Sequence, residues 1–263
     1  MGHTYISKAG LPDGRISWSD EEHLTWKKLL SRQKHIIQKY ASKECVEGLN
    51  RIAFDHGKIP QHNSINKRLK GMTGWVVIPV PAIISDEAFH MLLSQRKFPW
   101  ACFMRIPEEL DYIEEPDIFH EFFGHLPLLT WKPFADFLEA FWKFALMTDP
   151  RLRKYLFRIF WFTVEFGLIK RDGVMKIYGA WILSSYSETP RSLESSNIER
   201  IPFDILTCAR TSYRYDILQS KYFFIENFEE LFSLFENDIT PILEAASILG
   251  DIDTTPSPAL LSP

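Results

Sequence analysis

Two histidines and a glutamate lie within six residues near the middle of the chain. The segment from Glu114 to Leu129 reads E-E-P-D-I-F-H-E-F-F-G-H-L-P-L-L and holds His120, Glu121 and His125. Neutral imidazole binds iron, zinc, copper and nickel alike, so the pair predicts a metal site without naming the metal. The alternative is two structural histidines in the last turn of a helix, with Glu121 in solvent.

The spacing of the two histidines differs from that of the zinc-protease helix. H-E-x-x-H places its histidines four residues apart, on one helix face. His120 and His125 are five residues apart, which on a regular α-helix turns them about 140° away from each other. Both can reach one ion only if the helix ends or distorts between them, and Gly124 and Pro127 favour such a change. We therefore expect a helix end near Gly124.

A third candidate ligand lies forty residues after His125. Glu165 stands in W-F-T-V-E-F-G-L, the lone carboxylate of an apolar, aromatic segment. Burying an unpaired carboxylate is costly, so it should bind a metal or pair with an arginine. Two histidines and one carboxylate form the facial triad of non-haem iron(II) oxygenases. A zinc site made of the same residues is the alternative.

The elements that must position these residues are mostly helical. Ser19 and Glu22 form a capping-box pattern that begins a helix running to about Tyr40. The apolar face of this helix is predicted to carry Leu24, Leu29, Ile36 and Ile37. Further helices are predicted at 42–54, from Pro60 to Gly71 or Gly74, and at 85–93, 116–125, 134–147, 151–170 and 226–237. Short strands are predicted at 75–80, 98–106 and 176–178. The expected fold is mainly α (α+β), a single helix-rich domain with a few short strands.

The length of 263 residues allows one large domain. Residues 1–18 are predicted to form an irregular arm, residues 19–250 the folded domain, and the Pro- and Ser-rich residues 251–263 a flexible tail. The net charge of −4 comes without a basic tail or stripe, so no nucleic-acid partner is expected. No apolar stretch is long enough to span a membrane.

The cysteines and the N-terminus indicate a cytoplasmic protein. Cys45, Cys102 and Cys208 are odd in number and far apart, which disfavours a disulfide framework. No signal peptide is recognisable. The sequence allows a monomer or a small homo-oligomer.

Four blocks of the sequence resemble the pterin-dependent aromatic amino acid hydroxylases. They read I-P-Q-x-x-x-I-N-K-R-L with T-G-W-x-V-x-P-V-P between Ile59 and Pro81, E-E-L-D-Y-I-E-E-P-D-I-F-H-E-F-F-G-H-L-P-L-L from Glu108, F-W-F-T-V-E-F-G-L from Phe160, and I-Y-G-A-W-I-L-S-S-Y-S-E from Ile177. The bacterial phenylalanine hydroxylases are the most similar members. The resemblance covers roughly residues 17–240 and implies that the folded domain is the catalytic iron and pterin domain.

The resemblance implies a set of residues for the metal and the cofactor. His120, His125 and Glu165 match the iron(II) ligands of the family. Phe89 matches the ring that stacks on the tetrahydropterin, and a core phenylalanine is its alternative. Glu121 matches an acidic catalytic residue near the pterin ring, and an exposed helical glutamate is its alternative.

The resemblance also implies a set of residues for the amino acid. Arg105 matches the arginine that binds the substrate carboxylate, for which its guanidinium fork is suited. Asp117 matches the acid that holds this arginine, although an acid in the first turn of a helix would look the same. Ser184 matches a polar residue of the substrate pocket. Trp161, expected to act both in catalysis and in substrate binding, and Phe160 match the apolar wall near the iron.

The implied reaction is the hydroxylation of L-phenylalanine to L-tyrosine with O2 and a tetrahydropterin. The sequence departs from the family block Y-G-A-G at Trp181, and Tyr186 and Ser187 replace a common Phe and Gly. A tryptophan at position 181 would crowd or reshape the substrate side, so tryptophan or tyrosine as substrate remains an alternative. A zinc hydrolase and a ligand-binding protein without catalytic activity are the alternatives outside the family.

Overall fold

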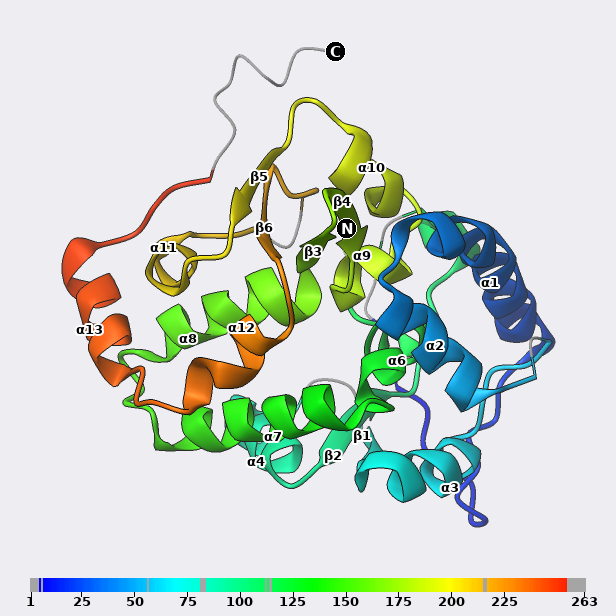
Figure 1. Cartoon of the computed structure of the whole chain (residues 1–263). Helices are drawn as coiled ribbons and strands as arrows, with labels where there is room; N and C mark the ends of the chain where they lie inside the picture. Colours follow the sequence, from blue (N-terminus) through cyan, green and yellow to red (C-terminus); the bar gives the residue numbers. More distant parts are fainter. Residues whose placement is uncertain are drawn as a thin grey trace.

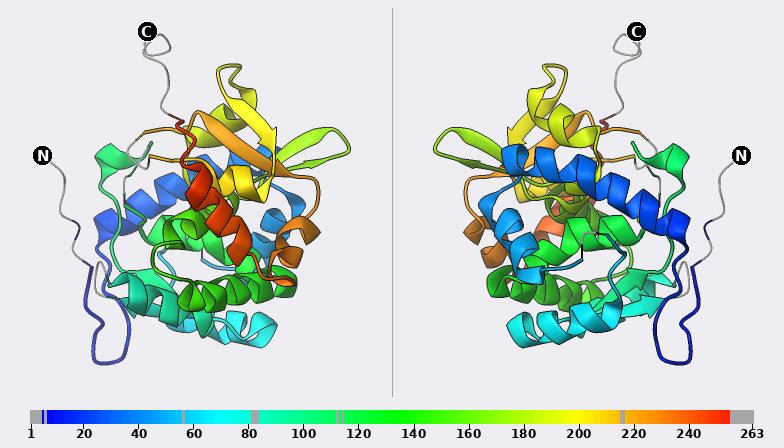
Figure 2. Two further views of the ribbon diagram at one scale, coloured as in Figure 1. Left: turned by 90° about the vertical axis from the view of Figure 1, so that its left-hand side faces the viewer. Right: turned by 90° about the vertical axis from the view of Figure 1, so that its right-hand side faces the viewer.

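A computed structural model describes residues 5, 7–55, 57–80, 84–111, 113, 115–214 and 217–254. The helices precede, separate and follow two small sheets (Figures 1 and 2). The α-helices are α1 (Asp20–Tyr40), α2 (Lys43–Ile52), α3 (His62–Thr73), α4 (Asp86–Ser94), α5 (Ile118–His120), α6 (Leu126–Leu129), α7 (Lys132–Met147), α8 (Arg153–Phe160), α9 (Ala180–Ser184), α10 (Glu188–Glu194), α11 (Ile205–Arg210), α12 (Glu229–Phe232) and α13 (Thr240–Leu249). The strands are β1 (Val76–Val80), β2 (Lys97–Ala101), β3 (Leu168–Arg171), β4 (Val174–Ile177), β5 (Glu199–Pro202) and β6 (Lys221–Ile225). The expected helix-rich domain with short strands is confirmed.

Local signals begin and end the first helices as expected. Ser19 and Glu22 form a complete capping box at the start of α1, and Gly74 ends α3 in the left-handed conformation with φ 79°. The apolar face of α1 is partly corrected, because Leu29 is buried whereas Leu24 is 51% exposed. Trp26, from the same helix, is the residue that enters the core, where it is fully buried.

The two sheets lie at opposite ends of the molecule, with helices between them (Figure 1). β1 and β2 pair in parallel, with Val76 opposite Lys97. The other sheet has the order β4-β3-β6-β5. Its β3–β4 hairpin turns at Asp172 and Gly173, both with positive φ, which is the conformation that an Asp-Gly hairpin turn needs.

Several predicted boundaries are wrong. The predicted helix 151–170 runs into β3, because Leu168 and Ile169 pair in parallel with β6. The predicted strand 98–106 ends at Ala101. The predicted helix 226–237 is only α12 followed by a 3-10 turn (Ser233–Phe235), and α13 was not predicted.

Residues near both ends of the described chain contact the folded domain. Lys8 donates its backbone N–H to the Cys102 carbonyl. Asp251, the first residue of the predicted flexible tail, forms an ion pair with Arg158 at 2.7 Å. Residues 255–263 of that tail, and Pro81 and Glu114 of the sequence blocks, lie outside the described residues.

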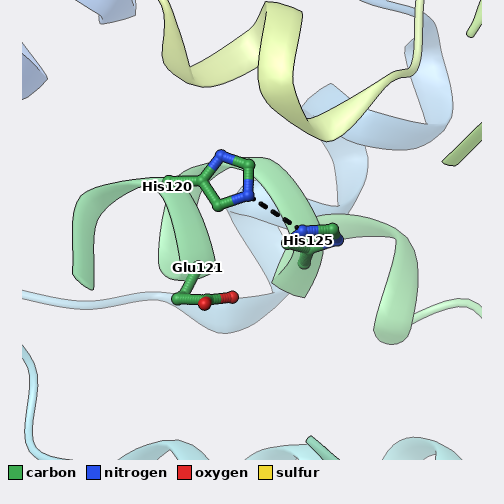
Figure 3. Close-up of side chains that lie close together, drawn as sticks. All are labelled: His120, Glu121 and His125. Atoms are coloured by element: carbon green, nitrogen blue, oxygen red, sulfur yellow. Dashed lines mark hydrogen bonds between the residues drawn. The ribbon is translucent and has the colours of Figure 1, made fainter. Parts of the chain in front are cut away.

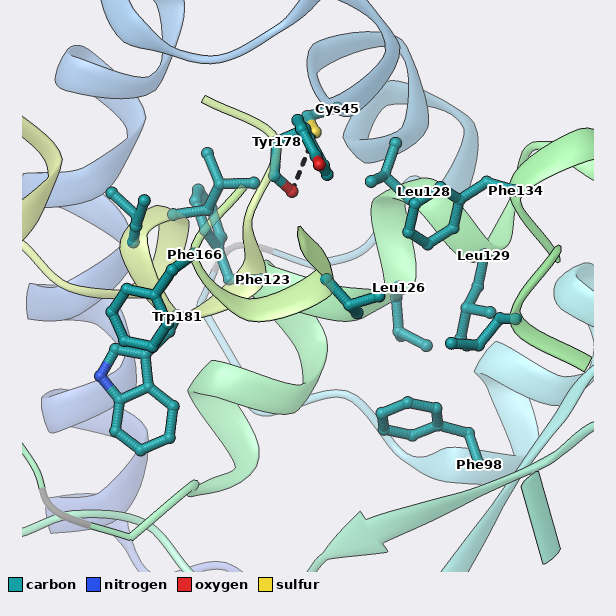
Figure 4. Close-up of a cluster of buried hydrophobic side chains, with 14 of the residues drawn as sticks. Cys45, Phe98, Phe123, Leu126, Leu128, Leu129, Phe134, Phe166, Tyr178 and Trp181 are labelled. Carbon is teal, nitrogen blue, oxygen red and sulfur yellow. Dashed lines mark hydrogen bonds between the residues drawn. The ribbon is translucent and has the colours of Figure 1, made fainter. Parts of the chain in front are cut away.

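The aromatic residues build much of the core. The ring of Trp26 packs edge-on against Phe119 and Phe122, which flank His120 and Glu121 in sequence. Figure 4 shows a neighbouring part of this core around α6, with Phe166 beside Trp181. The three cysteines are free and buried. Within the described part of the chain, no helix combines the length and the hydropathy needed to cross a bilayer.

Candidate metal centre and substrate cavity

The segment that carries the two histidines is a π-helical turn. After α5, residues Glu121–His125 form this turn, and Leu126 donates its N–H to the Glu121 carbonyl five residues earlier. A turn closed by five-residue bonds brings residues five apart to nearly the same side. The expected helix end near Gly124 is therefore wrong, because the helix widens and continues into α6 instead.

A second π-helical turn carries Glu165. It spans Trp161–Glu165 at the end of α8, and Phe166 donates its N–H to the Trp161 carbonyl at 2.9 Å. The turn stops there, and β3 begins at Leu168. Both segments that supply candidate ligands thus form π-helical turns. Such turns are rare in proteins as a whole, but they occur often at functional sites.

Glycines allow these turns to approach α9. A Cβ on Gly124 would lie 2.6 Å from the Ala180 carbonyl oxygen, and a Cβ on Gly179 would lie 2.5 Å from the Glu165 carbonyl oxygen. Both contacts are with backbone, which cannot move aside cheaply. The two glycines therefore fix α9 against both π-helical turns.

The three candidate ligands converge. The Nε2 atoms of His120 and His125 face each other at 3.0 Å (Figure 3). Glu165 places Oε1 3.2 Å from His125 Nε2 and Oε2 3.7 Å from His120 Nε2. The ligand atoms of His120, Glu121 and His125 also lie within 4.8 Å of one another. The arrangement is a buried metal-binding group of two histidines and a glutamate.

The pKa values of His120 and Glu165 favour the protonation states that bind a cation. Burial and the neighbouring His125 lower the pKa of His120 to about 3, so its imidazole is neutral, as a metal ligand must be. Burial opposes the ionisation of Glu165, but His125 and His120 outweigh it and lower the pKa of this carboxyl. The buried Glu165 Oε2 has no hydrogen-bond partner, which is costly unless an ion lies beside it.

Ser184 orients the ring of His120. Its hydroxyl donates to the Trp181 carbonyl at 3.1 Å and lies 2.9 Å from His120 Nδ1. Because the hydroxyl proton is used, Nδ1 is the donor in the second bond, and Nε2 keeps its lone pair. The family resemblance implied that Ser184 lies in the substrate pocket, but the sequence gave no sign of its hydrogen bond with His120.

Arg105 and Asp117 form a fully buried pair. Arg105 donates from Nε at 2.8 Å and from Nη2 at 2.9 Å to the two oxygens of Asp117, and these side chains are 1% and 0% exposed. Asp117 Oδ1 also accepts the His120 backbone N–H at 3.0 Å, as the N-cap of α5. One carboxylate therefore fixes both Arg105 and the start of the segment that carries His120.

A small cavity reaches from Arg105 to His120 of the metal-binding group. Its lining consists of Arg105, Ile113, Pro116, His120, Trp181, Ser184 and Ser185. The structure thus brings Arg105 and Ser184 together with His120, as expected. Ile113, Pro116 and Ser185 carry no chemical signature in the sequence and were not predicted.

Trp161 lies behind this cavity. Its ring centroid is 5.6 Å from that of Trp181, and on its other side it stacks on Tyr213 at 4.1 Å. Phe160, its neighbour, packs on Trp142 at 5.1 Å. Tyr213 was not predicted, because only the fold brings it beside Trp161.

Phe89 is held within an aromatic cluster on the α4 side. Its ring meets Trp142 edge-on at 5.4 Å, and the neighbouring His90 stacks on the same indole at 4.9 Å. Trp142 in turn contacts Phe160. Phe89 is therefore linked to the Trp161 turn through these rings, and it is partly exposed.

Glu121 lies on the same turn as the two histidines (Figure 3). It is partly buried. Burial, with the negative charges of Glu165 and Asp117, raises the pKa of Glu121 well above its usual value. Glu121 is therefore not the exposed helical glutamate that the alternative interpretation expected.

The chain is similar over nearly its whole length to bacterial enzymes of one family. The phenylalanine-4-hydroxylase of Pseudomonas aeruginosa is 42% identical over 246 residues, which cover 94% of each chain. The apo structure of the cold-active phenylalanine hydroxylase from Colwellia psychrerythraea matches with a TM-score of 0.91 and 42% identity, covering 96% of this chain and 98% of that chain.

A further solved structure agrees, and so does the family model. The cobalt-bound phenylalanine hydroxylase of Chromobacterium violaceum has a TM-score of 0.88 and 36% identity, over 95% of this chain and 92% of that chain. Residues 3–242 match the family described as biopterin-dependent aromatic amino acid hydroxylase. This chain belongs to the biopterin-dependent aromatic amino acid hydroxylases.

Proposed function

We propose that this protein is a phenylalanine 4-monooxygenase, which uses iron(II), O2 and a tetrahydropterin to convert L-phenylalanine to L-tyrosine. The observation that carries the proposal is the cavity that has Arg105 and the metal-binding His120 in its lining. An amino acid bound there has a cationic partner for its carboxylate and a metal site for its ring. The names of the relatives support phenylalanine as the substrate.

Glu165 is the proposed third ligand, ahead of Glu121. Its oxygens lie 3.2 and 3.7 Å from the two Nε2 atoms that face each other, and Oε2 is buried without a partner. Glu121 is near the same group, but it has the more exposed side chain of the two. We therefore assign Glu121 to the pterin side of the site.

The family match favours an iron(II) site over a zinc site made of the same residues. The two Nε2 atoms lie 3.0 Å apart, which is close enough for both to bind one ion. Two histidines and a carboxylate with open positions are the usual ligand set of iron(II) oxygenases.

The residues of the chain position the reactants. Arg105, held by Asp117, binds the carboxylate of the amino acid, since a fixed guanidinium fork recognises carboxylates with two parallel bonds. Ser184 keeps His120 Nε2 free for the metal. Phe89 offers a ring face to the pterin, and Trp161 supports the apolar wall behind the substrate. When bound, the iron and the reduced pterin supply the activation of O2.

Measuring bound iron in two variants shows whether Glu165 or Glu121 is the third metal ligand. Glu165→Ala should lose iron and turnover, whereas the matched variant Glu121→Ala should retain iron. The purified proteins are reconstituted anaerobically with iron(II), and bound iron is counted after gel filtration. Iron retained by Glu165→Ala at the wild-type level would remove Glu165 from the ligand set.

Product analysis tests the reaction itself. The wild-type protein receives phenylalanine, tyrosine or tryptophan with a tetrahydropterin, and O2 uptake and hydroxylated products are measured. Tyrosine formation from phenylalanine supports the proposal. Turnover without a pterin, or hydrolysis without O2 uptake, would contradict it. The cytoplasmic location, the lack of a nucleic-acid partner and the oligomeric state remain predictions.

A further inference from the structure

Trp181 forms one wall of the substrate cavity. It is the second residue of α9, it is 8% exposed, and it shares the cavity lining with Arg105 and His120. Its ring centroid lies 5.1 Å from that of His120. The indole therefore stands beside the metal-binding group and faces the space in which a substrate ring must lie.

The indole cannot swing out of this position. Phe166, which is 1% exposed, stacks on it at 5.9 Å, and Trp161 packs on it at 5.6 Å. Trp161 is itself supported by Tyr213. Figure 4 shows the Trp181 and Phe166 rings lying against each other. Closely packed rings of this kind resist displacement, because a shift would leave a void or force strained rotamers.

The backbone of Trp181 is fixed as firmly as its ring. The residue before it, Ala180, lies against Gly124 with no room for a methyl group between them. The carbonyl of Trp181 accepts a hydrogen bond from the Ser184 hydroxyl. The direction of the side chain is therefore set by the same contacts that position the two π-helical turns.

The indole takes up more room in this cavity than any other side chain. Trp181 is the largest residue of the lining, which it shares with Arg105, Ile113, Pro116, His120, Ser184 and Ser185. An indole at position 181 therefore occupies volume that a smaller side chain would leave open to a substrate.

We propose that Trp181 is a specificity-determining residue, whose indole restricts the cavity between Arg105 and His120 to amino acids with a single aromatic ring. The inference rests on the proposed function. An amino acid whose carboxylate is bound by Arg105 points its ring toward His120 and along Trp181. A second fused ring, as in tryptophan, competes for the volume that the Trp181 indole fills.

The test compares binding and turnover of phenylalanine and tryptophan in Trp181→Gly, Trp181→Leu and Trp181→Phe. Steric discrimination in apolar pockets is typically about 10- to 200-fold. The ratio of kcat/KM for tryptophan over phenylalanine should therefore rise at least about 10-fold in Trp181→Gly, and by less in Trp181→Leu and Trp181→Phe. Calorimetric binding of both amino acids to iron-loaded protein without pterin should show the same order and requires no turnover.

Controls separate a size effect from loss of structure. Trp131→Phe is the matched variant of Trp181→Phe, because the Trp131 ring packs on Phe228 and Phe232; it should leave the ratio unchanged. Thermal melts identify variants that fail to fold, and the milder substitutions then carry the test. An unchanged ratio in folded Trp181 variants overturns the inference while the proposed function stands. Wild-type protein that binds neither amino acid would instead refute the proposed function.

Discussion

The buried pair of Arg105 and Asp117 gives the sharpest test of the site. Asp117→Asn removes the charge but keeps a side chain that can cap α5, because asparagine and aspartate are comparable N-cap residues. Asp117→Ala removes both the charge and the cap. The difference between the two variants therefore isolates the cap, and the effect of Asp117→Asn isolates the charge.

The magnitudes follow from the complete burial of the two side chains, which are 1% and 0% exposed. Breaking a buried ion pair by removing one partner costs about 3–5 kcal/mol, because the other charge is left uncompensated. Loss of the cap adds about 1 kcal/mol. We expect the free energy of unfolding to fall by about 3–5 kcal/mol in Asp117→Asn and by about 1 kcal/mol more in Asp117→Ala.

Urea unfolding at neutral pH measures both effects, and a double-mutant cycle with Arg105→Met tests their origin. Arg105→Met should be strongly destabilising alone. The double variant Arg105→Met/Asp117→Asn should recover much of the loss, since neither charge then remains buried without its partner. Losses that simply add, or Asp117→Asn as stable as the wild type, would refute the reasoning.

Three further variants follow from the same structure. Ser184→Ala removes the bond to His120 Nδ1 and should weaken metal affinity about 10- to 100-fold, measured by competition with a chelator; unchanged affinity would contradict the orienting role. Gly124→Ala places a methyl group 2.6 Å from the Ala180 carbonyl oxygen and should cost about 1–3 kcal/mol of stability in urea unfolding, whereas an unaffected midpoint would show that the two segments can separate. Burial raises the pKa of Glu188 from 4.5 to about 7, so ionisation disfavours the folded state, and stability should fall by on the order of 3 kcal/mol between pH 4.5 and 7. Thermal melts over this range should become flatter in Glu188→Gln, and an equally steep profile in that variant would exclude Glu188 as the cause.

Elements with local signals could be predicted from the sequence. The capping box at Ser19 and Glu22 and the glycine end of α3 depend on neighbouring residues, and both are confirmed. The Asp172-Gly173 pair is a local hairpin signal, and the structure has its turn there. The strand before it is missed because the apolar stretch favours one helix over residues 151–170. The boundary at Leu168 depends on pairing with β6, more than fifty residues later, which no local pattern contains.

The grouping of the three candidate ligands could be predicted from the sequence, but the backbone that brings them together could not. The chemistry of His120, His125 and Glu165 indicated a metal group, and their side chains do converge. A π-helical turn has no composition of its own, so only the impossibility of two histidines five apart on an α-helix indicated a distortion. The wall at Trp181 was noticed as a departure, but its supporting rings come together only in the fold.

The π-helical turn at Glu121–His125 also bears on how such sites can change by insertion and deletion. A π-helical turn holds one residue more than an α-helical turn, so loss of one residue would restore the α-helical period without rotating the chain beyond it. The two histidines would then be four residues apart, a spacing that shares a face on an ordinary α-helix. Sequence spacing and spatial spacing are thus separate variables, and two sites with different histidine motifs can present the same pair of nitrogens to a metal.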